Sequence, residues 1–352
     1  MPGSAFFSNW NFKTGDLCTF NGVTCNSNNT KVTKLYLGGY PGLTGRLDPF
    51  YLNMTSITEL AVIPGTIDGT LPESLSSLTS LTLLSITGNL FRGEIPASIG
   101  NLRNLKTLDL SCNRLTGSIP WQIGGLPALT RLALSGNLLS GSVPVFLTQT
   151  LITVDLTANN LTGGLPVNAF PPSIQYLSLP RNQLSGSVYQ ILSRLNKLKY
   201  LDLGINQFTG GIPASIFSLP SITSLRLDRN IFSGELPSTV GQVNINVVDL
   251  SYNGFSGGIP PGFSVVTSLS VNNNQLTGEV PSEFLDRVLS SHIKLLDLRH
   301  NLLRSSNNLS AVIPAEGAAW CWASNSSASP TCSPEDVDGK FEKRPTELCK
   351  VG

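Results

Sequence analysis

The chain has 352 residues, a formal net charge of +1 and only 13% charged residues. This near-neutral balance gives no reason to expect nucleic acid or an acidic membrane surface as a partner. No stretch of about 18 or more apolar residues is present, so we expect no membrane span.

Two cysteines mark the N-terminal segment. Cys18 and Cys25 have six residues between them and come directly before the first leucine-rich segment. We expect them to form a disulfide that covers the apolar edge of that segment, which otherwise faces water. Residues 1–31 are therefore predicted to be an N-terminal cap. Residues 1–7 lack the basic region, apolar run and cleavage site of a secretory signal.

A repeated pattern follows the cap. The stretch 201–213 has counterparts at 108–120 and 248–260, and the period is about 24 residues. A period of this length predicts a solenoid, in which each coil buries its apolar edge against its neighbours.

One coil shows what each position does. Leu201 and Leu203 fall on one face of a short strand, and Asp202 falls on the other, so one face is buried and the other is open. Asn206 follows where the chain turns, and its amide can satisfy the backbone groups of that turn. Gly210 then permits a bend in the backbone.

The same pattern predicts twelve coils over residues 32–304. The central aliphatic residues of their strands are Leu35, Leu60, Leu84, Leu108, Leu132, Val154, Leu177, Leu201, Leu225, Val248, Leu269 and Leu296. A ladder of asparagines is predicted at Asn89, Asn113, Asn137, Asn159, Asn182, Asn206, Asn230, Asn253, Asn274 and Asn301.

Two motifs indicate the class of repeat. One is Cys-x6-Cys with an aromatic residue and Gly-Val inside it. The other is Leu-x-x-Leu-x-Leu-x-x-Asn-x-Leu-x-Gly-x-Ile-Pro, whose last six positions read Leu-Thr-Gly-Ser-Ile-Pro at 115–120. Together they resemble the plant-specific class of extracellular leucine-rich repeat proteins, from about Ser8 to the end of the chain. The resemblance implies an α/β solenoid: a right-handed superhelix with a concave parallel sheet, disulfide-bonded caps and a second short sheet made by the Gly-x-Ile-Pro segments. Val188-Tyr189 replaces the aliphatic-proline pair in one coil, which puts the second sheet in doubt there.

The remaining cysteines include three in a predicted C-terminal cap, residues 305–352. Cys321, Cys332 and Cys349 cannot all pair with one another, and we expect one pair that includes Cys349, with Cys332 as its partner. Cys112 lies far from them in the sequence, beside a ladder asparagine. We expect it to be a reduced, small apolar residue that fills its repeat.

Glycosylation signals agree with an extracellular location. Asn-x-Ser/Thr triplets begin at Asn28, Asn53, Asn160, Asn308 and Asn325. Together with the paired cysteines they favour a secreted glycoprotein of the extracellular space or cell wall.

Patterns for catalysis are lacking. His292 and His300 have no cysteine or histidine at metal-ligand spacing, and Ser290-Ser291-His292 is not a nucleophile elbow. The glycines recur with the coil and form no phosphate-binding loop. We therefore expect no enzyme, no metal and no cofactor.

The open face of the predicted sheet is the candidate binding surface. Its central coils mix acidic side chains with tyrosine and arginine, which often carry interface energy. The cluster comprises Tyr176, Tyr200, Asp202, Arg226, Asp228 and Asp249, and Arg181, Arg229, Tyr252 and His300 form a neighbouring column at the strand exits. We expect Asp202 and Arg226 to be exposed neighbours. The alternative is that such aspartates only supply a solvated residue between two leucines.

These features favour a recognition protein that binds a protein, peptide or cell-wall glycan through its concave face. Resemblance to the polygalacturonase-inhibitor proteins implies a role in plant defence, with a pathogen's secreted polygalacturonase, and also pectin, as partners. An alternative is the ligand-binding ectodomain of a receptor or receptor-like protein in defence or development, with a receptor kinase as partner, although the face carries no Arg-x-Arg pair for a peptide carboxylate. Ice binding, known in some similar proteins, is a further alternative that the uneven coil spacing disfavours.

Overall fold

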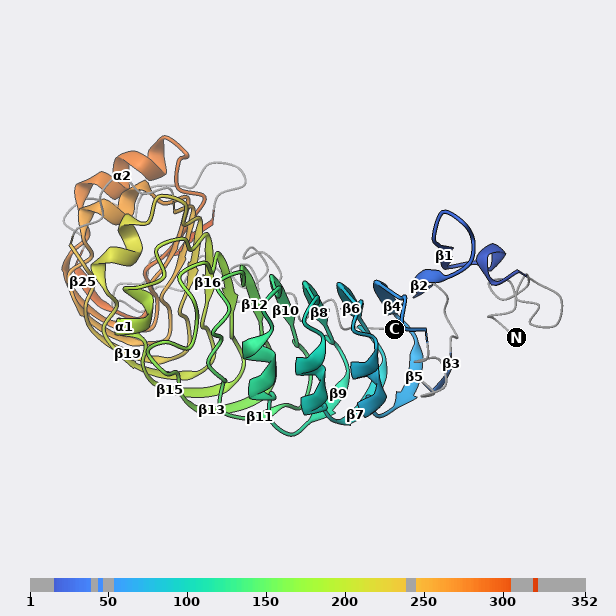
Figure 1. Cartoon of the computed structure of the whole chain (residues 1–352). Helices are drawn as coiled ribbons and strands as arrows, with labels where there is room; N and C mark the ends of the chain where they lie inside the picture. The colour runs from blue at the N-terminus through green and yellow to red at the C-terminus, as the bar shows by residue number, and fades with distance from the viewer. Residues whose placement is uncertain (1–15, 39–43, 47–53, 239–244, 305–318, 322–352) are drawn as a thin grey trace. The chain divides into compact units, whose positions relative to one another are not determined.

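The computed structural model describes residues 16–38, 44–46, 54–238, 245–304 and 319–321, the last three as backbone only. The described residues belong to two units: 16–162 with 168–173 in unit 1, and 163–167 with 174–321 in unit 2. Each unit consists of coils in which a main-sheet strand is generally followed by a second-sheet strand and a short helix (Figure 1). The predicted cap boundaries after residues 31 and 304 stay predictions.

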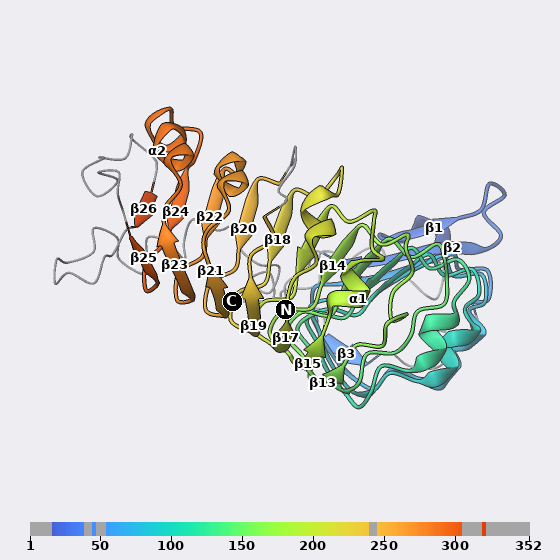
Figure 2. The ribbon, with the colours of Figure 1, turned by 90° about the vertical axis from the view of Figure 1, so that its left-hand side faces the viewer.

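Each unit has a main sheet of short strands (Figure 2). In unit 1 the order is β1 (Val23–Cys25), β2 (Val32–Gly38), β4 (Glu59–Ile63), β6 (Leu83–Ser85), β8 (Thr107–Asp109), β10 (Arg131–Ala133) and β12 (Thr153–Asp155). In unit 2 it is β14 (Tyr176–Ser178), β16 (Tyr200–Asp202), β18 (Ser224–Arg226), β20 (Val247–Asp249), β22 (Ser268–Ser270), β24 (Leu295–Asp297) and β26 (Ala319–Cys321). The described neighbours are parallel, apart from the antiparallel pair β1 and β2.

Smaller parallel sheets and short helices complete the coils. The second-sheet strands are β3 (Thr44–Arg46), β5 (Thr66–Gly69), β7 (Leu90–Glu94), β9 (Arg114–Thr116), β11 (Ser140–Gly141), β13 (Asn160–Gly164), β15 (Gln183–Ser187), β17 (Gln207–Gly210), β19 (Ile231–Glu235), β21 (Gly254–Gly257), β23 (Gln275–Glu279) and β25 (Leu302–Arg304). The 3-10 helices are η2 (Leu17–Thr19), η4 (Glu73–Ser77), η5 (Ala97–Asn101), η6 (Trp121–Gly125), η7 (Ala214–Ser218) and η8 (Pro261–Val265), and the α-helices are α1 (Tyr189–Leu192) and α2 (Ser282–Leu289).

The predicted strand cores are confirmed. All twelve predicted aliphatic residues lie in main-sheet strands, and none is more than 9% exposed. Two main-sheet strands were not predicted. β1 pairs with β2, and β26 pairs with β24, with Trp320 opposite Leu296. Both lack the aliphatic alternation from which the other strands were recognised.

Aromatic residues continue the core beneath the second sheet. In unit 2 the rings of Phe208, Phe232 and Phe255 stack one coil upon the next, with centroids 6.3 and 6.1 Å apart. In unit 1, Phe146 and Phe170 stack at 5.8 Å. Offset ring pairs of this kind are stabilising beyond the area that they bury.

The asparagine ladder is confirmed as a set of hydrogen bonds between coils. The Nδ2 group of Asn206 donates to the carbonyl of Leu179 in the preceding coil at 3.0 Å and to that of Leu203 in its own coil at 3.1 Å. Its Oδ1 accepts from the N–H of Leu184 at 3.0 Å. Each such asparagine therefore satisfies backbone groups that the turn leaves without backbone partners.

The second sheet persists at the coil where it was in doubt. β15 pairs with β17, with Gly186 opposite Phe208. The change from aliphatic-proline to Val188-Tyr189 coincides with a difference in the segment after the second-sheet strand, because the residues from Tyr189 form the α-helix α1. Val188 has a φ of −102° and a ψ of 3°, whereas the prolines before η4, η5 and η7 have an extended backbone.

The N-terminal disulfide is confirmed between Cys18 and Cys25, whose Cα atoms are 5.5 Å apart. The expectation that Cys112 is reduced is wrong, because Cys112 is disulfide-bonded, to a partner outside the described side chains. It is half-buried, in a turn where its φ is 57°, rather than in the core. Cys332 and Cys349 lie outside the described residues, so their pairing stays a prediction.

We predict that Cys18→Ser lowers the free energy of unfolding by about 2 kcal/mol or more, because the bridge restricts the unfolded chain and ties η2 to β1. The melting temperature in non-reducing buffer measures this. Cys18→Ser/Cys25→Ser serves as the matched control and should behave like the single variant. An unchanged melting temperature would count against a stabilising cap.

A second prediction concerns the ladder. Asn206→Ala removes the partners of the Leu184 N–H and the Leu179 carbonyl, and we expect a loss of about 1–3 kcal/mol in urea denaturation. Gln207→Ala, at the exposed position next to it, is the control and should change stability little. Equal midpoints for the two variants would contradict the ladder's role.

Candidate functional site

The predicted residues of unit 2 come together on the open face of its main sheet. Tyr176 lies opposite Tyr200 in the register of β14 and β16. Asp202 lies opposite Arg226, which in turn lies opposite Asp249. The spacing of the repeat therefore places these side chains in columns, as the sequence predicted.

The central column is nevertheless buried. Asp202 is 0% exposed, Arg226 3% and Asp249 8%, and Asp228 is buried as well. The expectation that Asp202 and Arg226 are exposed neighbours is wrong. Strands about 4.8 Å apart leave each side chain of the column flanked by those of both neighbouring strands. None of these charged groups is without a partner.

The column aspartates have a structural role that the repeat explains. At Asp202 the Oδ1 atom accepts the N–H of Gly204, two residues later, at 2.9 Å. The same bond recurs at Asp109, Asp155, Asp249 and Asp297, with lengths of 3.1, 3.0, 3.1 and 3.2 Å. Aspartate here caps the backbone as the strand ends, a local bond that the side chain is suited to make. The alternative of a solvated residue between two leucines does not hold at Asp202 and Asp249, which are buried.

Two further contacts engage aspartates of this column within their own coils. The Tyr200 hydroxyl donates to Asp202 Oδ2 at 3.3 Å. Asp297 is the last residue of β24, and the guanidinium of Arg299, two residues later, donates two hydrogen bonds to its carboxylate at 2.9 and 2.7 Å. Both side chains are buried. Such bidentate pairs are among the stronger polar contacts.

The exposed side chains belong to the column at the strand exits, which we call the exit column. It comprises Arg181, Ile205, Arg229, Tyr252, Asn273 and His300, and each of these residues has a positive φ between 54° and 57°. Arg181, Arg229, Tyr252 and His300 are exposed. The Arg229 guanidinium lies 4.3 Å from the centre of the Tyr252 ring, a cation–π contact.

Tyr176 and the four exposed residues of the exit column thus form the accessible part of the predicted site. Tyr176 and Tyr252 are each 43% exposed, although both carry large rings. Exposed arginine and tyrosine on rigid strand ends provide contact area, hydrogen-bond donors and positive charge. The arrangement suits an extended ligand with acidic groups.

Unit 1 carries a charged cluster that the sequence did not indicate. Glu59 accepts the Tyr36 hydroxyl and lies 2.7 Å from Lys34 Nζ. The bond from Lys34 lowers the pKa of Glu59, and the bond to Glu59 raises the pKa of Tyr36. These residues lie in adjacent strands, so only the strand register could have revealed the cluster.

Other predicted sites have mixed outcomes. Asn28 and Asn160 are exposed, whereas Asn53, Asn308 and Asn325 lie outside the described residues. His292 Nδ1 lies 2.8 Å from Ser290 Oγ, but that hydroxyl also donates to the Asp286 carbonyl at 2.7 Å. The described part of the chain contains no group of three or more potential metal-binding side chains, and no helix there could cross a membrane.

We predict that Asp249→Ala destabilises unit 2 by about 1–3 kcal/mol, because it removes the acceptor for both the N–H and the hydroxyl of Ser251. Urea denaturation measures the change. Asp249→Asn keeps an oxygen at the same place and should recover part of the loss. If Asn is as damaging as Ala, charge rather than backbone capping accounts for the aspartate.

Comparison with known proteins identifies leucine-rich repeats in this chain. The Leucine rich repeat family model matches residues 79–139, the Leucine rich repeat N-terminal domain model matches residues 2–26, and a further Leucine Rich Repeat model matches 197–219, 244–266 and 265–286. No curated protein sequence matches the chain.

Solved structures with a similar fold include two plant receptors. The leucine-rich repeat ectodomain of the membrane receptor kinase GASSHO1/SCHENGEN3 from Arabidopsis thaliana, in complex with CASPARIAN STRIP INTEGRITY FACTOR 2, is 30% identical with a TM-score of 0.56; the match covers 74% of this chain and 38% of that one. The plant peptide hormone receptor RGFR1 with RGF2 is 30% identical with a TM-score of 0.57, covering 82% and 54%. This chain therefore spans about half or less of their length.

A plant ice-binding protein also has a similar fold. It is 24% identical with a TM-score of 0.61, and the match covers 85% of this chain and 90% of that one. At this identity the likeness concerns the fold alone.

Proposed function

Because the chain is a leucine-rich repeat protein that resembles the ectodomains of plant receptor kinases, we propose that it is an extracellular recognition protein. It binds a peptide or protein ligand through Tyr176 and the exit column of unit 2. The observation that carries the proposal is the set of exposed arginine and tyrosine side chains at successive strand exits. These residue types dominate binding energy in protein interfaces.

The chemistry of the exit column favours an acidic, extended ligand. Arg181 and Arg229 offer planar donors that match carboxylates, and the cation–π contact holds Arg229 beside Tyr252. The buried aspartates are engaged by their own backbone, so they offer little to a ligand. The peptide hormone receptor among the similar structures supports a peptide over a glycan. Secretion, glycosylation and action in defence belong to this proposal.

A direct test uses single variants at the exposed residues. Arg229→Ala and Tyr252→Ala should each weaken ligand binding at least tenfold, because truncation of such residues at a desolvated contact often costs about 2 kcal/mol or more. Arg194→Ala is the matched control, since Arg194 is an exposed arginine just after α1, away from the strand exits. Surface plasmon resonance with peptides captured from plant cell-wall extract supplies the readout.

The result also separates the possible ligands. Inhibition of a purified fungal polygalacturonase that is lost in Arg229→Ala identifies the partner as that enzyme. Peptide binding without inhibition identifies a receptor-type ligand. If Arg194→Ala weakens binding while both exit-column variants bind normally, the exit column is not the site.

Substitution of Arg226 is a poor test of binding. Its side chain is buried and partnered, so Arg226→Ala is expected to destabilise the fold as well as any complex. The exposed variants avoid this ambiguity, because truncating exposed side chains usually changes stability by less than about 0.5 kcal/mol.

A further inference from the structure

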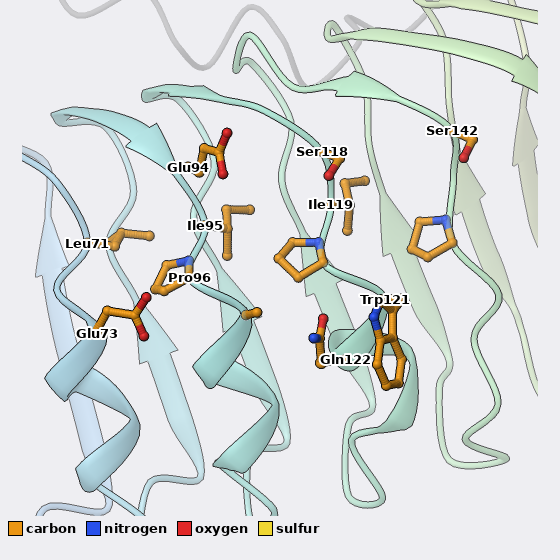
Figure 3. A pocket seen from close by; sticks show the side chains of 13 residues that line it. Leu71, Glu73, Glu94, Ile95, Pro96, Ser118, Ile119, Trp121, Gln122 and Ser142 are labelled. Atoms are coloured by element: carbon orange, nitrogen blue, oxygen red, sulfur yellow. The ribbon is translucent and has the colours of Figure 1, made fainter.

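A groove in unit 1 lies beside the second sheet and the 3-10 helices (Figure 3). Its volume is about 610 Å³, and its lining comes from four successive coils. Leu71, Ile95 and Ile119 line it together with Pro96 and Pro120, and its surface combines apolar and polar groups. The polar side chains around it include Glu73, Glu94 and Gln122.

The repeat itself creates this groove. Glu73, Ala97 and Trp121 are the first residues of η4, η5 and η6, so they occupy equivalent positions in three coils. Ala97 is small, and two coil spacings of about 4.8 Å leave a gap on the order of 10 Å between its larger neighbours. A gap of this size admits one long side chain.

Trp121 is exposed to an unusual degree. Its side chain is 73% accessible, the largest value among the exposed large hydrophobic residues in the described part of the chain. Covering this ring with a partner would remove a large apolar surface from water. Tryptophan is also the best aromatic platform for a cation.

The groove is acidic. The carboxylates of Glu73 and Glu94 form no ion pair within the described residues, and no lysine or arginine lines the groove. Glu94 lies close against Gly117, where a Cβ would stand only 2.7 Å from its Cγ. Arg92, in the same strand, lies outside the lining and faces Asp68 at 4.0 Å.

We propose that this groove binds a lysine- or arginine-bearing segment of a partner protein. The cationic group of that side chain lies between the two carboxylates and the Trp121 ring. The aliphatic part of the side chain covers Pro96 and Pro120. Both attractions act on the same charge, by ion pairing and by the cation–π contact. An acidic glycan such as pectin is repelled by the same carboxylates. This surface is separate from the exit column, which belongs to unit 2.

The probe for the test is an acetylated, amidated octapeptide with two central arginines in a Gly/Ser/Pro background. Counterparts with glutamine or glutamate at the same two positions carry zero or reversed charge. We expect the arginine peptide to bind at least tenfold more tightly than the glutamine peptide by isothermal titration. Raising NaCl from about 50 to about 500 mM should weaken it severalfold, because the charges are exposed.

Variants locate the binding. Glu73→Gln/Glu94→Gln and Trp121→Ala should each weaken the arginine peptide at least fivefold, and Trp121→Phe should keep more affinity than Trp121→Ala. Glu235→Gln is the matched control, because Glu235 holds the place of Glu94 in a unit 2 coil and lies against Gly257 as Glu94 does against Gly117. It should change affinity less than twofold. All four positions are at exposed side chains, so folding is retained.

Two results would overturn the proposal. One is equal affinity for the arginine and glutamine peptides, or binding that survives Glu73→Gln/Glu94→Gln. The other is Trp121-dependent binding of cellohexaose, a neutral sugar, without binding of the arginine peptide, which would make the groove a glycan site.

Discussion

The amide of each ladder asparagine joins the backbones of two successive coils, and the placement of every surface residue depends on it. At Asn113, Nδ2 donates to the Ile86 carbonyl at 2.6 Å, and Oδ1 accepts from the Phe91 N–H at 3.1 Å. Because both groups belong to the preceding coil, the turn after each main-sheet strand is set by its neighbour. The short strands can end after three residues without leaving polar groups unsatisfied.

The periodic features of the fold could be predicted from the sequence, since leucine alternation and the asparagine position each have one physical explanation. What escaped prediction depends on contacts between coils. The burial of Asp202 needs the flanking side chains of two other strands, which a pattern within one coil does not show. The bridged state of Cys112 likewise depends on a partner distant in the sequence.

The two candidate sites also differ in how well the sequence predicts them. The exit column was predicted because Arg181, Arg229 and Tyr252 occupy one position of the repeat. The groove of unit 1 was not, because it arises from a contrast in size between Ala97 and Trp121 in neighbouring coils. A signal existed in the sequence, namely a large aromatic residue directly after Ile-Pro, but its meaning needed the stacking of η5 on η6.

The positive φ of the exit-column residues affects which residue types this position can hold. A positive φ costs an L-residue about 1–2 kcal/mol, and a β-branched residue such as Ile205 is least suited to it. Gly88 and Gly136 hold the corresponding place in unit 1 at φ values of 69° and 64°. Cys112 and Ala158 hold it in two other coils of unit 1, so a side chain is accommodated there at a cost in local stability. Among related chains, we expect the coils that have kept bulky residues at this position to mark where a ligand is held.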